Sequence, residues 1–373
     1  MFFTRQEFGL RLTGKNVSLL HGIFRKTTYM HKQQYPSIYT IKSINKMKTL
    51  LAIIFLSALP TIAFAQNKNS IVFQDNGKPV PVADPCVYED NGVYYLTGTT
   101  GTTDGKHGFD YYYSKDLRTW TYGGPLFRVG ENHPGVDCFW APEVRKYNGK
   151  FYMTYSCYSN EHKGLVTCIA VSDYPDKGFK DLYVPWFAPK YTAIDCDIFI
   201  DDDGTPYLYY SKNTMLSDTI GVGEIYGVKL KKDLSGFVGD PVLISQASQK
   251  WEKVNWKKNR CNEGPWVIKH NGEYVMTYSA NDTGFEYYGI GVQTAKSPLG
   301  KWKKYKDNPL MTTDLSKGIS SPGHNSIVTS KDGKMYIVYH RHADPNCKKP
   351  NWDRVVCIDE IYFDKNGKLR IKE

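Results

Sequence analysis

Residues 91–98 read Asn-Gly-Val-Tyr-Tyr-Leu-Thr-Gly, a two-residue turn followed by a Tyr-rich apolar run, and this pattern occurs five times. Asn-Gly and Asp-Gly favour tight hairpin turns because both central residues tolerate positive φ. The apolar run after each turn is typical of a buried strand. The other four copies begin at Asn148, Asp203, Asn271 and Asp332, so the steps between copies are 57, 55, 68 and 61 residues.

Each of these turns also has a strand-like stretch before it, and a further polar turn follows each of the first four copies. A unit of about 60 residues with two paired strands and one or two outer strands is typical of a propeller blade. No stretch has the 3.6-residue period of a long helix. The sequence therefore predicts an all-β fold, a five-bladed β-propeller, with five unrelated hairpins in a sandwich as the alternative.

The excess of basic residues lies outside the repeated part of the chain. The net charge is +10, but residues 1–65 carry nine Lys/Arg and one acidic residue, which leaves 39 basic and 37 acidic residues for the remainder. A nucleic-acid-binding surface needs clustered positive charge on the folded domain itself. We therefore expect no nucleic-acid partner.

Residues 47–65 have the pattern of a secretory signal peptide. Met47-Lys48-Thr49 is followed by an apolar run and then by Ala63-Phe64-Ala65, which predicts cleavage near Ala65. The apolar run is short of the roughly 20 residues that a membrane span needs. The expected organisation is a leader of unclear status at 1–46, the signal peptide at 47–65 and an exported catalytic domain at 66–373, without a membrane partner.

One position in each repeat carries the candidate chemistry. Counting back seven or eight residues from each turn reaches Asp84, Trp140, Asp195, Glu263 and His324. Because the innermost strands of a propeller begin at the same end of the central channel, these side chains are expected to converge there. Taken singly, an acidic residue at a strand start is more often a solvated turn residue. Here each acidic residue lies in an apolar, Gly/Pro-shaped neighbourhood instead.

Converging carboxylates suit glycoside cleavage. That reaction needs a proton donor for the leaving oxygen and a second carboxylate on the opposite side of the sugar. Crowded carboxylates also push one another's pKa values apart, so that one stays protonated near neutral pH. An aspartate cluster could instead hold a hard cation, but the aromatic Trp140 in the same ring favours a sugar.

The motifs A-D-P, W-A-P-E-V, I-D-x-D-x-F-I-D-D-D-G, N-E-G-P and G-H-N-S, in this order from about Val80 to Phe363, resemble glycoside hydrolase family 43. The resemblance implies a five-bladed propeller and inverting hydrolysis. It implies that Asp84 is the general base and Glu263 the general acid, and that Asp195 modulates the pKa of the acid and orients it. Cys196 replaces the Pro usual in the I-D motif. An inverting enzyme should hold base and acid about 6.5–9.5 Å apart.

Four further residues are candidates for substrate binding. His324 resembles the family histidine near the channel centre, which implies a possible structural Ca²⁺ there and makes His324 a candidate indirect metal residue; a satisfied core histidine is the alternative. Trp140 and Phe139 are expected sugar platforms, although Trp140 could instead plug the channel. Arg341 could reach a sugar hydroxyl or form an exposed salt bridge. All eight cysteines follow the signal peptide, and no pair has zinc-knuckle spacing. We interpret Cys86, Cys138, Cys196 and Cys261 as packing residues or local disulfides.

The sequence thus predicts an exported inverting glycosidase with a carbohydrate partner and no required cofactor. An α-L-arabinofuranosidase acting on plant-type polysaccharide or oligosaccharide is the first expectation, and a β-xylosidase or β-galactosidase of the same family is the second. A non-catalytic sugar-binding propeller is the alternative from another class, since propellers host many functions. Substrate, exo or endo action, disulfide pairing and oligomeric state do not follow from the sequence.

Overall fold

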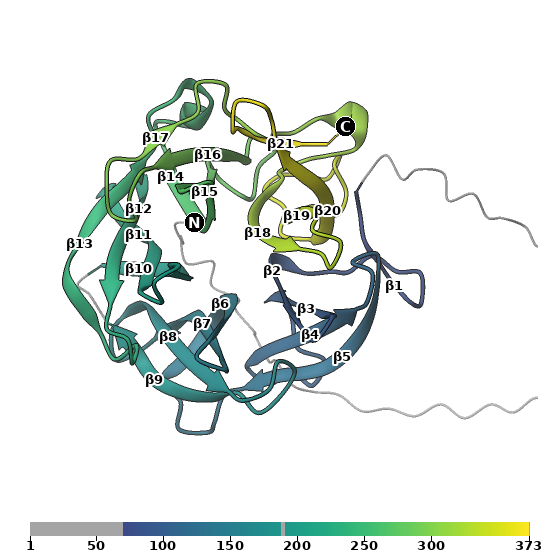
Figure 1. Ribbon diagram of the computed structural model, residues 1–373, viewed down its shortest axis with the longest axis vertical. Helices are drawn as coiled ribbons and strands as arrows, with labels where there is room; N and C mark the ends of the chain where they lie inside the picture. Colours follow the sequence, from purple (N-terminus) through teal and green to yellow (C-terminus); the bar gives the residue numbers. More distant parts are fainter. Residues whose placement is uncertain (1–69, 188–190, 373) are drawn as a thin grey trace, which may run out of the picture. The chain divides into compact units, whose positions relative to one another are not determined.

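The computed structural model describes residues 70–187 and 191–372. Within this part the regular secondary structure is β-strand, apart from two short 3₁₀ turns, η1 (Lys250–Lys253) and η2 (Leu315–Lys317) (Figure 1). The all-β prediction is confirmed. None of the described helices is long and apolar enough to cross a bilayer. The predicted leader at 1–46, the signal peptide at 47–65 and the cleavage site near Ala65 lie outside the described residues.

The strands form five consecutive antiparallel groups in which neighbours in the sequence are neighbours in the sheet. The first group is β2 (Ala83–Asp90), β3 (Val93–Thr99), β4 (Gly108–Ser114) and β5 (Thr119–Arg128), with β1 (Phe73–Gln74) parallel to β5. The second is β6 (Gly135–Tyr147), β7 (Lys150–Ser159), β8 (Gly164–Ser172) and β9 (Lys180–Phe187).

The third group is β10 (Thr192–Ile200), β11 (Pro206–Ser217), β12 (Ile220–Leu230) and β13 (Phe237–Gln246). The fourth is β14 (Asn259–His270), β15 (Glu273–Ala280), β16 (Gly289–Ala295) and β17 (Lys303–Lys304). A short parallel pairing of β12 with β14 joins these two groups into one eight-stranded sheet. The fifth is β18 (Gly323–Thr329), β19 (Met335–His342), β20 (Arg354–Phe363) and β21 (Leu369–Ile371).

All five predicted turns connect the first and second strands of a group. At the three Asn-Gly turns both residues have positive φ, for example 48° at Asn91 and 79° at Gly92, as expected for a two-residue hairpin. At the two Asp-Gly turns only the glycine does. The backbone N–H of Gly204 there donates to Asp201, and that of Asp201 donates to Thr205, which makes a longer loop. The position of each hairpin was therefore predicted correctly, and the turn type differs at two of them.

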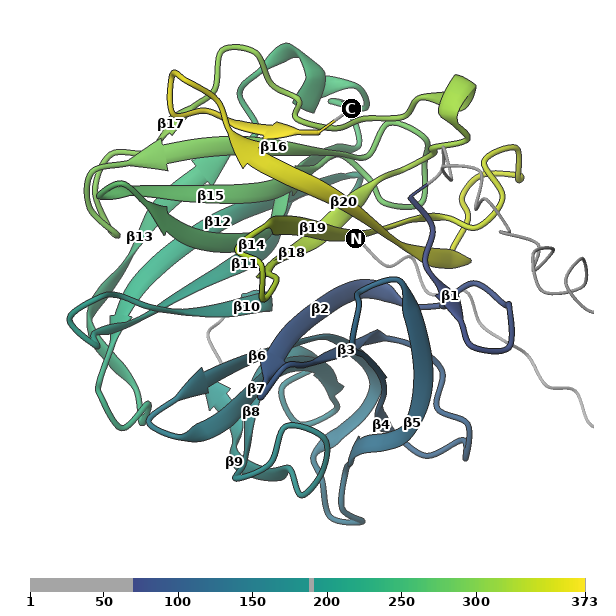
Figure 2. The same ribbon diagram turned by 45° about the vertical axis from the view of Figure 1, so that its right-hand side comes forward.

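The groups follow one another around a common centre (Figures 1 and 2). Each innermost strand contacts the next, in the order β2, β6, β10, β14 and β18, and β18 contacts β2 again. The segment before β1 connects the ends of this series, since Val72 donates a backbone hydrogen bond to Val356 in β20 while Phe73 pairs with Thr119 in β5. The N-terminal segment thus joins the first group to the last.

Apolar side chains fill the space between neighbouring groups. One buried cluster combines Leu96 and Trp120 of the first group with Val338 and Val356 of the last. Two others join the second group to the third and the third to the fourth. Burial of these faces fixes the groups against each other, and it thereby sets where the innermost strands end.

Candidate active site

Every innermost strand is interrupted by a β-bulge at the level of the predicted site. The pairing register shifts between residues 83 and 86, 140 and 143, 194 and 197, 263 and 266, and 323 and 326. The first extra residue has positive φ in each case, and these residues are Asp84, Ala141, Asp195, Gly264 and His324. A bulge bends the strand and redirects a side chain. The repeat therefore presents its site residues through five equivalent bulges.

Counting back from the turns located these bulges to within one residue. Asp84, Asp195 and His324 are the bulge residues themselves, whereas Trp140 and Glu263 are the last paired residues before the bulge. The structure thus brings the predicted carboxylates to the same level of the ring but places Glu263 one register position away from Asp84 and Asp195. Gly264 occupies the bulge in that strand with φ of 56°, a conformation that glycine adopts easily.

Asp84 is held by hydrogen-bonding groups from three strands. Thr99 Oγ1 donates to Asp84 Oδ2 at 2.6 Å, Nδ1 of His324 lies 3.3 Å from Oδ1, and Nδ1 of His340 accepts from the backbone N–H of Asp84. Burial by itself raises the pKa of Asp84, but these partners, His324 foremost, outweigh it and hold that pKa well below its usual range. With 20% of its side chain exposed, Asp84 is an ionised carboxylate that solvent can reach.

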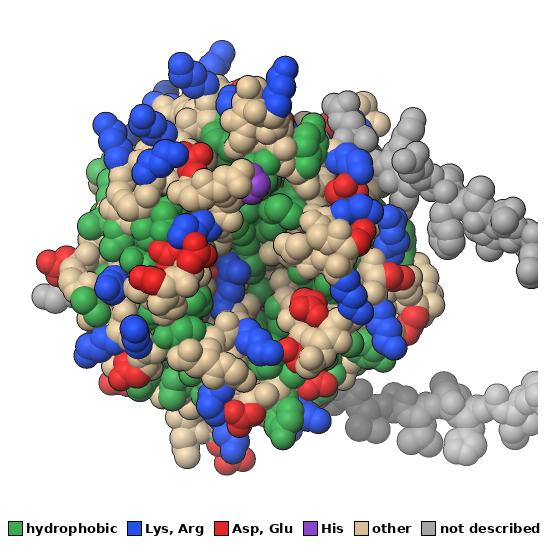
Figure 3. All heavy atoms as spheres, in the orientation of Figure 1, with side chains coloured by type: hydrophobic (Ala, Val, Ile, Leu, Met, Phe, Trp, Pro, Cys, Tyr) green, Lys and Arg blue, Asp and Glu red, His purple; other side chains and the backbone are tan. Residues whose placement is uncertain are grey.

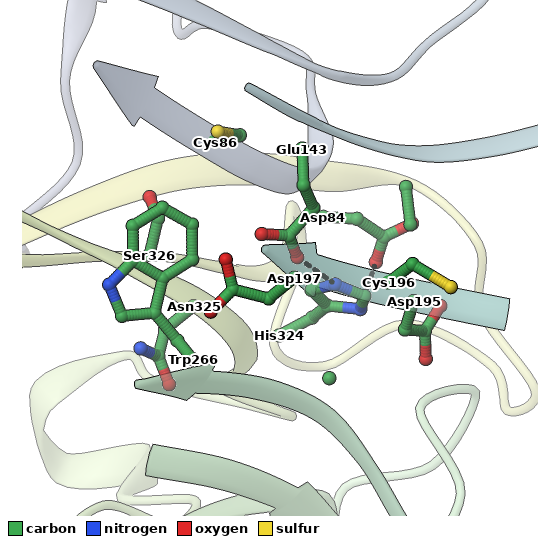
Figure 4. Close-up of polar contacts among 12 residues, drawn as sticks. Asp84, Cys86, Glu143, Asp195, Cys196, Asp197, Trp266, His324, Asn325 and Ser326 are labelled. Atoms are coloured by element: carbon green, nitrogen blue, oxygen red, sulfur yellow. Dashed lines mark ion pairs between the residues drawn. The ribbon is translucent and has the colours of Figure 1, made fainter. Parts of the chain in front are cut away.

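His324 lies between two carboxylates (Figure 4). Its Nδ1 faces Asp84, and its Nε2 lies 3.5 Å from Oε1 of Glu143. Burial lowers the pKa of His324, but Asp84, Asp195 and Glu143 together raise it to about 10. At neutral pH the ring is therefore an imidazolium, and it is the positive charge at the centre of the acidic groups.

His340 has the opposite charge state. The backbone N–H of Asp84 donates to His340 Nδ1 at 2.9 Å, so this nitrogen carries a lone pair and no proton. Burial lowers the pKa of His340 to about 4, and the nearby cations Arg354 and His324 lower it further. A neutral imidazole thus fixes the backbone of Asp84, while a charged one faces its carboxylate.

Asp195 and Glu263 are both buried and are linked through one serine. Ser211 Oγ donates to Asp195 Oδ2 at 3.2 Å and accepts from the N–H of Gly264, the residue after Glu263, at 3.2 Å. Burial raises the pKa of Asp195 to about 6, and the charges of Glu263 and Asp84 raise it as well, against the opposite effect of His324. Glu263 accepts from Tyr288 OH at 2.8 Å and from Cys261 Sγ at 3.1 Å.

Glu143 is a site residue that the sequence reasoning missed. It is buried, it follows the bulge of β6 and it contacts His324, and burial raises its pKa to about 7. The signal was present, because Glu143 is the glutamate of W-A-P-E-V. It was overlooked because only one position per repeat was considered, and Glu143 belongs to a second level two residues beyond the bulge. His340 and Thr99, on second strands, were missed for the same reason.

Two predicted substrate contacts do not fit their positions. Phe139 is 9% exposed and packs against His107, His133 and Tyr155, so its ring is covered by protein and the platform role is not retained. Arg341 is 3% exposed and donates to the carbonyl of His342, so the exposed salt bridge is wrong as well.

Trp140 and the cysteines occupy positions within the strand groups. Trp140 is half-buried and ends the pairing before the bulge of β6. No disulfide joins any of the eight cysteines, all of which lie among the described residues, so the predicted local disulfides are not present and the packing interpretation holds. Cys86 illustrates it, since its Sγ accepts a hydrogen bond from the backbone N–H of Val144.

His324 is not placed to ligate a calcium ion directly, because both of its ring nitrogens face carboxylates. The possible structural Ca²⁺ in the channel, which would involve His324 only indirectly, stays a prediction. Among the described residues, three or more His, Cys, Asp or Glu donor atoms converge at only one place, which does not include His324.

A hollow of about 670 Å³ lies near the Asp84 bulge, although none of the three predicted carboxylates is among its lining residues. Its lining includes Ala83 and Thr99, the neighbours of Asp84 in sequence and in hydrogen bonding, together with Trp352 and Arg354. Trp352 is 49% exposed, whereas Arg354 is 7% exposed and its Nε has no hydrogen-bond partner among the described residues. On the face drawn in Figure 3, basic and acidic side chains are interspersed and do not gather into one basic stripe.

Comparison with known proteins matches this chain to one family of glycosyl hydrolases. The model of "Glycosyl hydrolases family 43" matches residues 78–369. The β-D-galactofuranosidase xynD of Aspergillus niger is 28% identical over 301 residues, which cover 77% of this chain and 81% of that protein. An extracellular exo-α-(1→5)-L-arabinofuranosidase of Streptomyces avermitilis is 28% identical over 248 residues, which cover 61% of this chain and 48% of that protein.

Solved structures are similar over most of the described chain. A thermostable family-43 glycoside hydrolase is 41% identical with a TM-score of 0.73, and the match covers 79% of this chain and 93% of that one. An endo-1,4-β-xylanase from Bacteroides thetaiotaomicron is 32% identical with a TM-score of 0.69, covering 79% and 95%. The named activities of these relatives differ, although their fold and family are shared.

Proposed function

The chain belongs to glycosyl hydrolase family 43 and is a glycoside hydrolase, and from this premise we propose that it cleaves furanosides with inversion, α-L-arabinofuranosides first. The observation that carries the proposal is the ring of five bulges, which gathers an ionised Asp84 and the buried Asp195 and Glu263 around one cationic His324. β-D-Galactofuranosides are the second candidate, because the Aspergillus niger relative bears that name and shares 81% of its length with this chain. β-Xylosides and β-galactosides follow.

We further propose that the five strand groups are the blades of a five-bladed propeller. The sequential contacts of the innermost strands, the return contact of β18 with β2 and the pairing of Val72 with Val356 support a closed ring. Radial repetition also limits the liability of free sheet edges, because only the outer strand of each blade remains an edge. In this arrangement the five bulges face one channel end.

Asp84 acts as the general base in this proposal. It takes a proton from water as the water oxygen bonds to the anomeric carbon, and the bond from that carbon to the leaving oxygen breaks. Its lowered pKa supports the role because the carboxylate is ionised at neutral pH. Thr99 and His324 each occupy one carboxylate oxygen, which fixes the orientation of the group toward the water.

Glu263 acts as the general acid, and Asp195 positions it. Glu263 gives its proton to the leaving oxygen, and the proton is replaced from solvent after product release. The Ser211 bridge from Asp195 to the backbone of Gly264 supports the positioning role. Asp195 remains protonated up to about pH 6, which limits the negative charge beside Glu263 during the reaction.

The hollow near the Asp84 bulge is the proposed substrate site. Trp352, which is 49% exposed, offers an aromatic ring to an apolar sugar face. The same lining would serve a sugar-binding propeller that has no activity. The ionised base and the buried Asp195–Glu263 pair favour the enzyme, since a binder has no use for them.

The test is hydrolysis by the full chain of 4-nitrophenyl α-L-arabinofuranoside, β-D-galactofuranoside and β-D-xylopyranoside, with proton NMR of the first-formed anomer. We expect furanoside cleavage with inversion and a loss of about 10²–10⁴-fold in Asp84→Asn. Glu263→Gln should lose as much on natural linkages but much less on a dinitrophenyl glycoside, whose leaving group needs little protonation. Asp202→Asn, whose side chain is 81% exposed, is the matched control. Retention of configuration, or full activity in both site variants, would refute the assignment.

Export is proposed as well. The apolar run and the Ala-x-Ala ending at 63–65 support it, as does the word extracellular in the names of the Streptomyces relatives. N-terminal sequencing of the exported protein should begin at Gln66. Retention of the whole chain in the cytoplasm would contradict the proposal.

A further inference from the structure

The two carboxylate oxygens of Glu263 face donors of different strength. Tyr288 OH donates to Oε1 at 2.8 Å, and the thiol of Cys261 donates to Oε2 at 3.1 Å. A phenolic O–H is a full hydrogen-bond donor, whereas an S–H is a weak one. Glu263, Cys261 and Tyr288 are 6%, 1% and 1% exposed, so bulk water does not compete with either contact.

Both donors keep their protons near neutral pH. Burial raises the pKa of Tyr288 well above its usual range, and the charge of Glu263 raises it further. Burial also raises the pKa of Cys261 well above its usual range, again with the charge of Glu263 as the next cause. Each group is therefore a neutral donor to the carboxylate and is neither a base nor a nucleophile.

The backbone of β18 and the ring of His340 hold the ring of Tyr288 in place. Gly323 begins β18, and a Cβ atom at this position would overlap the ring of Tyr288, so the ring lies directly against the strand backbone. The rings of Tyr288 and His340 are stacked, with centroids 6.0 Å apart and planes 8° apart. Tyr288 thus contacts both the proposed acid and the histidine that fixes the backbone of Asp84.

The loop that carries the tyrosine is anchored as well. Residues 281–288 connect β15 to β16. Asn281 Nδ2 donates to the carbonyl of Tyr287 at 3.0 Å, which ties the two ends of the loop together. Between these ends, the carbonyl of Thr283 accepts from Ser321 Oγ at 2.8 Å. These contacts keep the phenol beside the carboxylate.

We propose that Tyr288 and Cys261 are positioning residues for the general acid, in which Tyr288 fixes Oε1 of Glu263 and Cys261 faces Oε2 without holding its proton. The inference rests on the proposed role of Glu263. In the acid form Oε1 accepts from the phenol, and the transferable proton resides on Oε2. Glu263 passes this proton to the leaving oxygen as the glycosidic bond breaks, while the phenol and the thiol keep their own protons.

Loss of the phenol should also change how the acid ionises. A hydrogen bond donated to a carboxylate favours its charged form, so Tyr288→Phe should move the basic limb of the pH profile, which reports ionisation of the acid, to higher pH. The substitution leaves in place the charged groups that face this region from neighbouring strands, which are Asp195, Asp84, His324 and Arg354. The shift thus reports the phenol.

The test compares Tyr288→Phe with Tyr287→Phe in the full chain. Tyr287 is the matched control, because the same hydroxyl is lost one residue away, where it accepts from Asn255 Nδ2 at 3.2 Å. On the phenyl glycoside of the sugar that the wild type cleaves, we expect Tyr288→Phe to lose about 10–100-fold in kcat with KM unchanged. The basic limb of kcat/KM should rise by about 1 pH unit. Tyr287→Phe should show neither change, and both variants should cleave a dinitrophenyl glycoside at nearly the wild-type rate.

Cys261→Ala tests the other oxygen and does not depend on the folding of the tyrosine variant. We expect kcat within about threefold of the wild type and a smaller shift of the basic limb in the same direction, because the thiol is the weaker donor. Cys168→Ala, which removes a fully buried thiol from β8, is its control. A loss in Cys261→Ala as large as that in Tyr288→Phe would contradict the assignment of the proton to Oε2.

Two outcomes overturn the role of Tyr288. One is a Tyr288→Phe variant with the kcat and the pH profile of Tyr287→Phe, and the other is an equal loss on the phenyl and the dinitrophenyl glycosides. Glu263→Gln, assayed on the same two substrates, separates this failure from that of the proposed function. If Glu263→Gln keeps its activity on the phenyl glycoside, Glu263 is not the acid; if it loses that activity alone, only the positioning inference fails.

Discussion

Asp84 and Asp197 are aspartates on innermost strands, and each faces a cation, yet they are built differently. Asp197 is fully buried, and Arg145 donates to both of its oxygens at 2.8 and 3.0 Å, while the backbone N–H of Val267 donates to Oδ2. Asp84 is partly open to solvent, and its cation is the titratable His324 at 3.3 Å.

The difference separates a structural ion pair from a reactive one. A guanidinium is always charged and its fork matches a carboxylate, so the Arg145–Asp197 pair is closed to other partners. Trp266 covers the guanidinium, whose carbon is 3.5 Å from the ring centre. The pair at Asp84 leaves part of the carboxylate free, which a base that must meet a water molecule requires. Variants at Asp84, Asp197 and His324 test whether one pair serves the reaction and the other the stability of the fold.

The largest effect is expected on activity in Asp84→Asn. The amide keeps the shape and the contact with Thr99 but cannot accept a proton from water, so we expect kcat/KM to fall by about 10²–10⁴-fold. Because Asp84 and the buried His324 stabilise each other's charged forms, the free energy of unfolding should also fall, by about 1–2 kcal/mol. Steady-state kinetics and urea unfolding on the same preparation measure both. If Asp84→Asn lost stability but kept its activity per folded molecule, Asp84 would not differ from Asp197 in the way we propose.

Asp197→Ala should show the reverse pattern. Removing the carboxylate leaves the guanidinium of Arg145, whose side chain is 23% exposed, without its partner and the buried N–H of Val267 without an acceptor, which costs about 3 kcal/mol of unfolding free energy. Activity per folded molecule should fall less than in Asp84→Asn. Urea unfolding and active-site titration separate the two quantities. The idea fails if Asp197→Ala is as stable as the wild type.

His324→Gln should move the acid limb of the pH–rate profile. In the wild type the imidazolium lowers the pKa of Asp84, so loss of this charge raises that pKa and shifts the acid limb to higher pH, by about 1–2 pH units. Because the pKa of Asp84 is already far below its usual range, the profile of kcat/KM is followed from about pH 2 upward, and Asp202→Asn serves as the unshifted control. An unchanged acid limb would show that His324 does not set the charge of Asp84.

The free energy of unfolding should depend on pH through Asp195 and Glu143, the two buried acidic residues of the site whose pKa values are raised. The pKa of Asp195 rises from 3.8 to about 6 and that of Glu143 from 4.5 to about 7, so the folded state binds more protons than the unfolded state between about pH 4 and 7. Stability from these groups is present below pH 4 and is lost as the pH rises through 7, by about 1–3 kcal/mol in total. Glu143→Gln should flatten the curve of unfolding free energy against pH. A curve identical to that of the wild type would contradict the shift at Glu143.

The sequence predicted the residues at the five bulges better than it predicted the side chains that contact them. Turn residues and the two-residue period of strands are local signals, so the five Asn/Asp-Gly turns located Asp84, Asp195 and His324 without knowledge of the packing. Glu143, Arg145 and His340 act through contacts between strand groups. Whether a buried Arg meets a carboxylate or a solvent molecule depends on the angle between sheets, which no single repeat encodes.

Contacts between strand groups also explain why the predictions for Phe139 and Arg341 were wrong. Phe139 and Trp140 are adjacent aromatic residues, and the sequence alone predicted that both form a platform for the sugar. The bulges of β6 rotate the strand there, since Cys138 and Ala141 on either side have positive φ. Phe139 consequently faces the core. Charged residues are usually exposed, but Arg341 lies near the C-terminal end of β19, where the strand is buried.

The smallest effect in this series is expected in Ser211→Ala, which tests whether the reactive region depends on a single neutral hydroxyl. Ser211 links Asp195 to the backbone N–H that follows Glu263, so its removal loosens the acid but leaves both carboxylates and the cation in place. We expect kcat to fall by less than about tenfold with KM unchanged, because the loss of one neutral hydrogen bond is worth about 0.5–1.5 kcal/mol. The fall should be larger on poor leaving groups than on dinitrophenyl glycosides, since only the former need the acid. Equal losses on both would place the role of Ser211 in general stability and not in the positioning of Glu263.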